Sequence, residues 1–195
     1  MLLVSLDSER RANMKTLKNH LKEKYNLSNY QIAQLGFLAK TLASEISKMI
    51  IMAVIFYKHL PLYFFALFIM LILRTYTGGI HFYTYIGCLV TTTIFLLLGI
   101  IVLPNIAIPL NIKLFLLLLC IITCYLIGPI PSKYRPPYSE QFLRKCKLIV
   151  SSAICIYTFV LYIVPDSKYM IVGFWIIILH TLQLIIAKYT RKEAS

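Results

Sequence analysis

The segment that decides the fold of this chain is residues 61–103, which reads PLYFFALFIMLILRTYTGGIHFYTYIGCLVTTTIFLLLGIIVL. Two apolar runs flank a short polar island, Arg74–Cys88, which holds an arginine, a glycine pair, a histidine and a cysteine. Polar groups are costly inside a membrane, so a cluster of them between apolar runs indicates a functional site. Cysteine and histidine are also the residue types that supply a thiolate nucleophile and its base.

The composition of the whole chain indicates a membrane protein. Of the 195 residues 59% are hydrophobic and 14% are charged, whereas soluble domains carry about 25% charged residues. We therefore predict an all-α polytopic membrane protein. Cytoplasmic loops and anionic lipids explain the net charge of +13 better than nucleic acid does, so nucleic acid is not an expected partner.

The cysteines and the remaining motifs predict neither a disulfide framework nor a cofactor. The number of cysteines, five, is odd, and four of them lie in or beside apolar runs. Cys120 and Cys124 share a helix face, but no third or fourth ligand accompanies them, so we interpret them as core packing and expect no metal. The motifs of serine hydrolases, zinc proteases and nucleotide-binding enzymes do not occur in the sequence.

The apolar runs predict a helical bundle of about six spans. They cover residues 38–58, 61–73, 85–103, 112–130, 148–164 and 169–187. Prolines lie at the ends of the later runs, as expected of helix boundaries. The run 61–73 is short for a bilayer, so it either continues through Arg74 to Gly78 or thins the bilayer locally. Alternatively, the first two runs form a re-entrant hairpin, which leaves four full spans.

We assign residues 31–190 to the membrane domain, and the remaining segments flank it. Residues 1–30 are predicted to form a basic amphipathic helix on the inner membrane surface, and residues 191–195 a basic tail. Within the first run, Glu45 is interpreted as the partner of Lys48, three positions further along the helix.

The distribution of lysine and arginine predicts the orientation in the membrane. With the N-terminus inside, fifteen of the twenty lie in inner segments, three lie in outer segments, and Lys40 and Lys48 fall in the first run. Positively charged loops stay in the cytoplasm, so both termini are expected there. The polar island, as the active site, and the basic loop 132–147 are then expected at the cytoplasmic face.

The spacing of His81 and Cys88 constrains how the two can meet. They are seven positions apart, and on one straight helix their side chains would be about 10 Å apart along the axis. A direct contact therefore requires a break in the helix, for which the Gly78-Gly79 pair is suited. We expect His81 in a loop or at a helix start, and Cys88 about one turn inside the following span. Backbone N–H groups at that helix start could hold an oxyanion.

Other residues of the chain leave alternatives open. Arg74 could hold the oxyanion, bind a substrate carboxylate or be an ordinary arginine at the membrane surface. Ser139, Glu140 and Gln141 are candidates for orienting His81. Two further functions are considered: a small ion-coupled transporter that uses Glu45 and His180, and a membrane cytochrome that binds haem through His81 and His180.

The order Arg, Gly-Gly-x-His and a Cys seven residues later resembles the AgrB family of accessory gene regulator proteins. The likeness extends through the basic N-terminus, the basic inner loop and the total length. Members of the family are membrane-embedded cysteine endopeptidases of quorum-sensing bacteria, which process a propeptide, AgrD. The resemblance implies that Cys88 is the nucleophile and His81 the general base, with Arg74, Gly78 and Gly79 in supporting roles.

The resemblance also implies a two-stage reaction at the bacterial cell membrane. Cys88 would displace the acidic C-terminal tail of the propeptide and form an acyl-enzyme thioester. A Cys or Ser of the peptide would then convert the thioester to a thiolactone or lactone ring. The expected partners are an AgrD-type propeptide, a bilayer with anionic lipids and, as a further option, a second copy of the chain as a homodimer.

Overall fold

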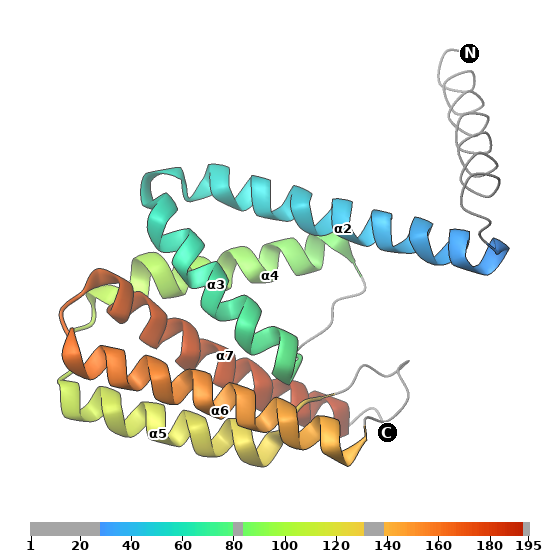
Figure 1. Cartoon of the computed structure of the whole chain (residues 1–195). Helices are drawn as coiled ribbons and strands as arrows, with labels where there is room; N and C mark the ends of the chain where they lie inside the picture. Colours follow the sequence, from blue (N-terminus) through green and yellow to red (C-terminus); the bar gives the residue numbers. More distant parts are fainter. Residues whose placement is uncertain (1–27, 80–83, 131–138, 193–195) are drawn as a thin grey trace. The chain divides into compact units, whose positions relative to one another are not determined.

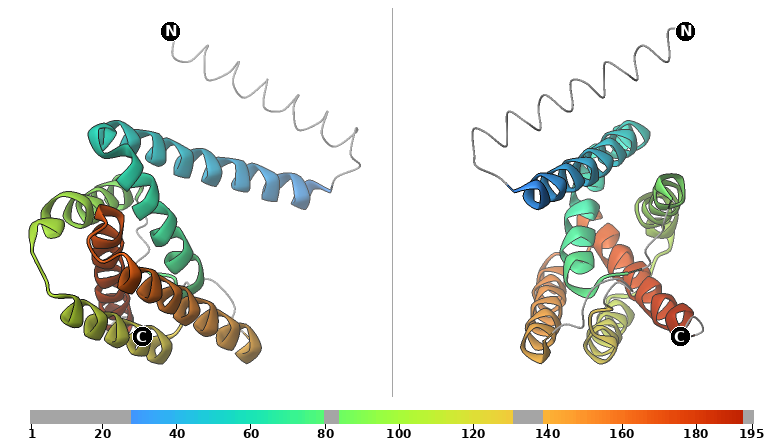
Figure 2. Two further views of the ribbon diagram at one scale, coloured as in Figure 1. Left: turned by 60° about the vertical axis from the view of Figure 1, so that its left-hand side comes forward. Right: turned by 90° about the vertical axis from the view of Figure 1, so that its right-hand side faces the viewer.

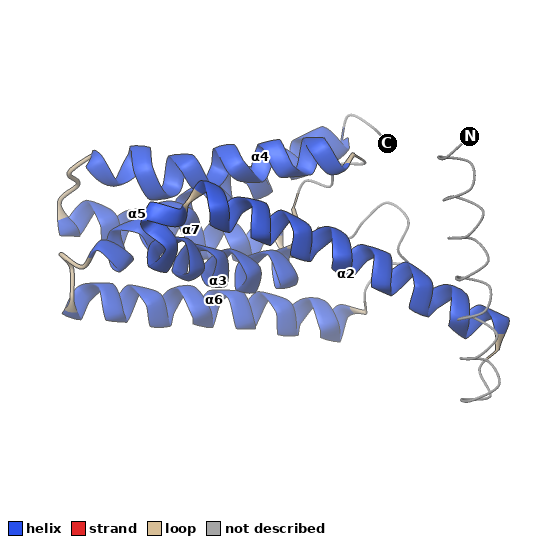
Figure 3. Cartoon of the chain, turned by 90° about the horizontal axis from the view of Figure 1, so that it is seen from above, coloured by secondary structure: helices blue, strands red, loops and turns tan. Residues whose placement is uncertain are grey.

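The computed structural model describes residues 28–79, 84–130 and 139–192. Contacts divide the chain into two units, Met1–Ile51 and Met52–Ser195, which we describe separately. Helices make up nearly all of the described residues, and these three ranges contain no strand (Figures 1 and 3). This confirms the predicted all-α fold class.

The first unit holds most of helix α2, Asn29–Ile55. Within it, the ammonium of Lys48 lies 2.5 Å from Glu45 Oε1, which confirms the expected ion pair. With these two charges and Lys40, α2 is not among the described helices that are apolar enough to cross a membrane. The predicted amphipathic helix lies almost entirely in residues 1–27, outside the described residues.

Five segments of the described chain are long and apolar enough to cross a membrane: Tyr57–Thr77, Tyr85–Asn105, Leu110–Ile127, Glu140–Ile163 and Lys168–Thr190. The polytopic architecture is therefore confirmed, with five such segments where about six were expected. The difference lies at α2, where charged residues interrupt the apolar run.

The helical segment that contains the short apolar run 61–73 extends beyond that run at both ends. After the 3₁₀ turn η1, Tyr57–His59, helix α3 covers Leu60–Thr77 and so continues through Arg74. Together they contain 21 residues, which corresponds to roughly 30 Å and so to the apolar thickness of a bilayer. This length favours a full crossing over the re-entrant alternative.

The remaining segments follow the predicted spans closely. Helix α4, Tyr85–Leu97, continues through the π-helical turn η2, Leu98–Val102, into the 3₁₀ turn η3, Leu103–Asn105. Helices α5 and α7 cover Leu110–Ile127 and Lys168–Lys192.

Helix α6, Glu140–Ile163, corrects one prediction. The expected basic loop 132–147 ends at Ser139, because the hydroxyl of Ser139 accepts the backbone N–H of Phe142 at 3.3 Å and caps the helix. Glu140 and Gln141 are therefore the first residues of α6, and residues 131–138 lie outside the described residues.

Helix α7 is the central helix of the second unit. It packs against α3, α5, η2 and η3, while α6 packs against α3 and α5 (Figure 2). Half of the most apolar window of α7 is buried inside the protein, compared with 17% for the segment that contains α4. Gly173 permits this close packing, because a Cβ there would lie 2.7 Å from Ile69 Cδ1 and equally close to Tyr157 Cε2.

Apolar contacts within the second unit form two clusters. The first joins α3, the α4–η2 segment and α7, and the second joins α3, α5, α6 and α7. Cys120 and Cys124 are buried in the second cluster beside Leu117, which confirms that they are core residues. Among the described residues, no group of three His, Cys, Asp or Glu side chains could hold a metal ion.

Candidate functional site

The candidate site lies at one end of the second unit, which we call the site end. There the backbone N–H of Ile130, just after α5, donates to the carbonyl of Thr77, the last residue of α3, at 3.0 Å. Lys147 of α6 packs on Gly128, where a Cβ would lie 2.6 Å from its Cε. The site end therefore gathers the C-termini of α3 and α5 and the N-terminus of α6, although these segments are far apart in the sequence.

The glycine pair forms the turn that ends α3 at the site end. Gly78 has φ +76°, and its N–H donates to the carbonyl of Arg74 at 3.0 Å, so it caps the helix in a conformation that favours glycine. A Cβ on Gly78 would lie 2.7 Å from the carbonyl oxygen of Ile130. Gly79 is buried, with the side chain of Gln183 about 4 Å from where a Cβ would be. The turn is thus held against α5 and α7.

Cys88 lies one turn inside α4, as the sequence predicts. The helix starts after Thr84, whose hydroxyl accepts the N–H of Gly87 at 3.2 Å and whose carbonyl accepts the N–H of Cys88 at 3.1 Å. Thr84 has an extended backbone, with φ −104° and ψ 141°. Thr84 therefore interrupts the helix between positions 81 and 88, which is the condition for a contact between the histidine and the cysteine. The Cys88 side chain is half-buried.

A small cavity lies further along the face of α4 that carries Cys88, and we call it the polar cavity because four of its six lining residues are polar. Thr91 and Thr92, three and four positions further along that face, line the cavity together with Arg74 of α3 and Gln183 of α7. The space is only large enough for about one water molecule. This places Arg74 and the Cys88 face on two sides of the same opening.

His81 lies in residues 80–83, outside the described residues. In the sequence it is four residues after Thr77 and three before Thr84, so the two ends of its segment are the glycine turn and the start of α4. The structure therefore brings Arg74, Gly78, Gly79 and Cys88 to one end of the second unit.

Two polar residues of α7 also lie at the site end, although the sequence alone does not predict them there. His180 is fully buried, and its Nε2 lies 2.7 Å from the hydroxyl oxygen of Thr77. Gln183 borders both the glycine turn and the polar cavity. The signal for both was a polar side chain within an apolar run. From the sequence alone, His180 is a candidate only for ion coupling or haem binding.

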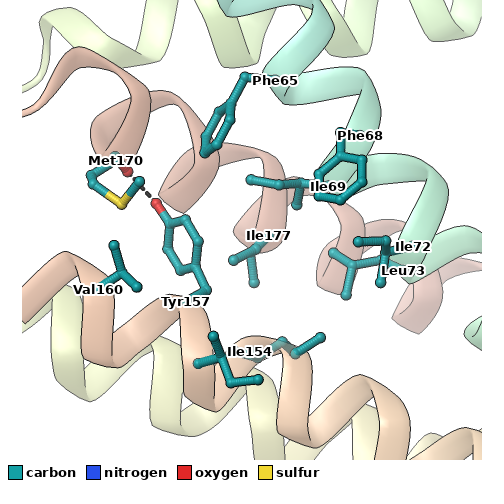
Figure 4. A pocket seen from close by; sticks show the side chains of 12 residues that line it. Phe65, Phe68, Ile69, Ile72, Leu73, Ile154, Tyr157, Val160, Met170 and Ile177 are labelled. Carbon is teal, nitrogen blue, oxygen red and sulfur yellow. Dashed lines mark hydrogen bonds between the residues drawn. The ribbon is translucent and has the colours of Figure 1, made fainter.

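A second, larger cavity has no chemistry that would make it an active site. It has a volume of about 430 Å³ and lies between α3, α6 and α7, with walls that include Phe65, Leu73, Ile154 and Ile177 (Figure 4). The polar group of its wall, the Tyr157 hydroxyl, donates to the carbonyl of Met170 (Figure 4). The walls of this cavity are therefore almost wholly apolar, and none of its lining residues carries a thiol or an imidazole.

The position of Glu45 disfavours the transporter hypothesis. Glu45, which that hypothesis needs as a buried coupling group, has a 60% exposed side chain and is paired with Lys48. Ser139, a candidate for orienting His81, accepts the N–H of Phe142 as the cap of α6.

These observations define a class: a polytopic α-helical membrane protein with a glycine turn at the end of one helix and a half-buried cysteine at the start of the next. The sequence profile described as "Accessory gene regulator B" matches residues 14–184. This match covers most of the chain, and the protein therefore belongs to the AgrB family. An AgrB-like protein of Clostridium beijerinckii is 28% identical over 128 residues, which span 63% of this chain and 63% of the relative. No solved structure matches the chain.

Proposed function

We propose that this protein is a membrane-embedded cysteine endopeptidase that processes an AgrD-type propeptide, with Cys88 as the nucleophile and His81 as the general base. The observation that carries the proposal is the position of Cys88. It lies one turn inside α4, on the face that borders the Arg74–Gln183 cavity, and the segment that leads to it contains His81. Family membership supplies the role in the accessory gene regulator system.

The start of α4 offers donors for the negative charge that develops during attack. The first N–H groups of a helix have no acceptor within the helix, and the side chain of a helical residue leans toward them. The Thr84 hydroxyl accepts the N–H of Gly87. The N–H of Ile86 has no acceptor within α4 itself. We propose that this N–H and the Arg74 guanidinium stabilise the oxyanion.

The reaction proceeds in two acyl transfers. The Cys88 thiolate attacks a peptide carbonyl, the C–N bond breaks, and the leaving amine of the acidic tail takes a proton from His81. A thiol or hydroxyl of the bound peptide then gives its proton to His81 and attacks the thioester, which releases the Cys88 thiolate and closes a thiolactone or lactone ring. Exchange of one thioester for another changes the free energy little, whereas hydrolysis would destroy the intermediate. The ring therefore forms only if water is kept from the intermediate, which suits a site at the membrane surface.

The charges at the site end support a cytoplasmic orientation in the bacterial membrane. The basic residues Arg144, Lys145, Lys147 and Lys188 lie in the first turns of α6 and the last turns of α7. Because positively charged segments stay in the cytoplasm, we place the site end there. The same charges attract anionic lipids and the acidic tail of the propeptide.

The proposal is tested by co-expression of the propeptide with the wild type and with Cys88→Ala, Cys88→Ser and His81→Ala, followed by intact-mass analysis of the peptide. The wild type shortens the propeptide, and the two alanine variants leave it whole. Cys155→Ala is the matched control, because Cys155 is an exposed cysteine of α6, and it cleaves like the wild type. Cleavage by Cys88→Ala at the wild-type rate would refute the proposal.

A further inference from the structure

Thr77 is held from three directions at the point where the chain leaves α3. Its hydroxyl lies 2.8 Å from the carbonyl of Leu73 on its own helix, and 2.7 Å from His180 Nε2 on α7. Its carbonyl accepts the N–H of Ile130 at 3.0 Å. A single residue thus connects α3 to α7 and to the segment after α5, one position before the glycine pair.

Burial of a histidine at position 180 costs free energy. It is 1% exposed, and its Nδ1 has no hydrogen-bond partner among the described residues. Burying a polar atom without a partner costs free energy, most of all between membrane-spanning helices. A leucine would fill a similar space without that cost, so packing alone does not account for the histidine.

The protons of the pair can be assigned from the donors present. The Thr77 hydroxyl has one proton, and when it donates that proton to Leu73 O, it accepts from His180 Nε2–H. Nδ1 is then the unprotonated ring nitrogen. In this arrangement the histidine acts as a neutral donor toward Thr77, and its position is fixed by α7, the most buried helix of the unit.

The glycine pair is what this hydrogen bond constrains. Glycine admits many backbone conformations, so a Gly-Gly turn directs the following residues only if neighbouring groups fix it. Here Ile130 lies against Gly78, Gln183 lies beside Gly79, and His180 holds the residue before both. The direction in which the chain leaves α3 therefore depends on α7 as well as on the turn itself.

We infer that His180 and Thr77 are positioning residues: their hydrogen bond fixes the Gly78–Gly79 turn, the point at which the chain leaves α3 ahead of His81. This inference rests on the proposed function, in which His81 is the general base. Because the pair holds the base and does not bind the peptide, its loss slows the chemical step and leaves substrate binding intact.

The test uses the purified full chain in vesicles that contain anionic lipid, with a synthetic propeptide as substrate. The variants that remove the bond are Thr77→Val, which keeps the side-chain shape, His180→Leu, and the two combined. Thr77→Ser and His180→Gln keep a hydroxyl and a donor at the two positions. Thr158→Val is the control, because the Thr158 hydroxyl donates to Ile154 O at 2.7 Å in the same way but within α6.

Thr77→Val and His180→Leu are each expected to lower kcat by roughly tenfold to a hundredfold, the usual effect of a catalytic group displaced by about 1 Å. KM and the rate of Cys88 alkylation stay near their wild-type values. The thermal midpoint falls for Thr77→Val, because this change leaves the buried His180 Nε2 without its partner. The double variant is no slower than the slower single variant, because both changes remove the same bond. Thr77→Ser and His180→Gln recover most of the rate, and Thr158→Val keeps it.

Several results overturn the inference. A folded His180→Leu variant with wild-type kcat does so, and so does a double variant whose loss is the product of the two single losses. If His180→Leu does not fold, the comparison of Thr77→Val with Thr77→Ser decides, and equal rates for these two contradict the inference. A wild type that does not shorten the propeptide refutes the proposed function itself and is recognised before any variant is compared.

Discussion

On the α3–α7 side of the candidate site, Thr77 and Gly79 are buried and held by other helices, whereas on the α4 side Cys88 and Thr91 are only half-buried. The contacts of the α4 segment with α7 are concentrated at its far end, in η2 and η3. There Gly99 lets the backbone approach α7, since a Cβ would lie 2.6 Å from Ile176 Cδ1. A water-sized cavity lies between the two sides, at Thr91 and Thr92 of α4.

Under the proposed function, this difference in packing suits two opposite requirements. A general base must be held in one place, because small displacements slow proton transfer. A nucleophile that attacks a peptide chain must be reachable, and the peptide must lie against it. The segment before His81 begins at the tightly packed side, and Cys88 lies on the loosely packed side.

The largest expected effect is in the reactivity of the cysteines. Cys88 is half-buried, while Cys120 and Cys124 are buried in the core. A buried thiol reacts only after the structure opens locally, so a small alkylating reagent is expected to modify Cys88 at least about a hundredfold faster than the two core cysteines. Mass spectrometry of proteolytic peptides over time measures the rates. Equal rates for Cys88 and Cys124 would contradict the difference in packing.

The next largest effect concerns the tightly packed side. Gly78→Ala combines a backbone conformation that disfavours side chains with a Cβ only 2.7 Å from the Ile130 carbonyl. Such strain costs roughly 1–3 kcal/mol, so the thermal midpoint falls, and we expect cleavage to slow by about tenfold or more as the turn shifts.

The control for Gly78→Ala is Gly36→Ala. That glycine lies inside α2, and a Cβ there meets no described atom within 4 Å. Alanine is the better helix former, so this variant is expected to be unchanged or slightly more stable. A Gly78→Ala variant that behaves like Gly36→Ala would show that the turn is not fixed.

A smaller effect is expected from the polar cavity between the two sides. Arg74→Gln removes a cationic donor, and the loss of a hydrogen bond to a charged group costs about 1.5–3 kcal/mol, so kcat/KM should fall by roughly tenfold to a hundredfold. Gln183→Leu should cost less, since its donor is neutral. Thr93→Val is the control: the Thr93 hydroxyl bonds to Leu89 O within α4, and Thr93 is not among the residues that line the cavity. Steady-state kinetics with the synthetic propeptide measure these effects. Wild-type kinetics for Arg74→Gln would contradict a role of the cavity in catalysis.

The smallest effect is that of salt on the encounter with the propeptide. Added salt shortens the screening length from about 8 Å at physiological ionic strength to about 3 Å at 1 M. KM is therefore expected to rise a few-fold with added salt, while kcat changes little. A propeptide with its acidic tail residues replaced by amides is the control and should show a much weaker dependence. A KM independent of salt would indicate that the basic site end does not attract the tail.

Local features of this site could be predicted from the sequence, and features that depend on distant residues could not. The position of Cys88 one turn inside α4 follows from the glycines and the apolar run that surround it, and the Glu45–Lys48 pair follows from helical spacing. The sequence predicts a basic loop up to residue 147, whereas α6 begins at Glu140, because Ser139 caps the helix and its basic residues lie in the first turns. His180 and Gln183 lie a hundred residues from the glycine turn, and only the packing of α7 brings them to it.

The central claim is that Cys88 forms a thioester with the propeptide, and an intact-mass measurement of the protein tests it most directly. The wild type is mixed with excess propeptide, quenched with acid during turnover and measured before and after treatment with neutral hydroxylamine, which cleaves thioesters. The account predicts an added mass equal to the propeptide without its tail, located on Cys88, removed by hydroxylamine and not formed by Cys88→Ala. Cleavage without any such adduct, or an adduct that persists in Cys88→Ala, would contradict it.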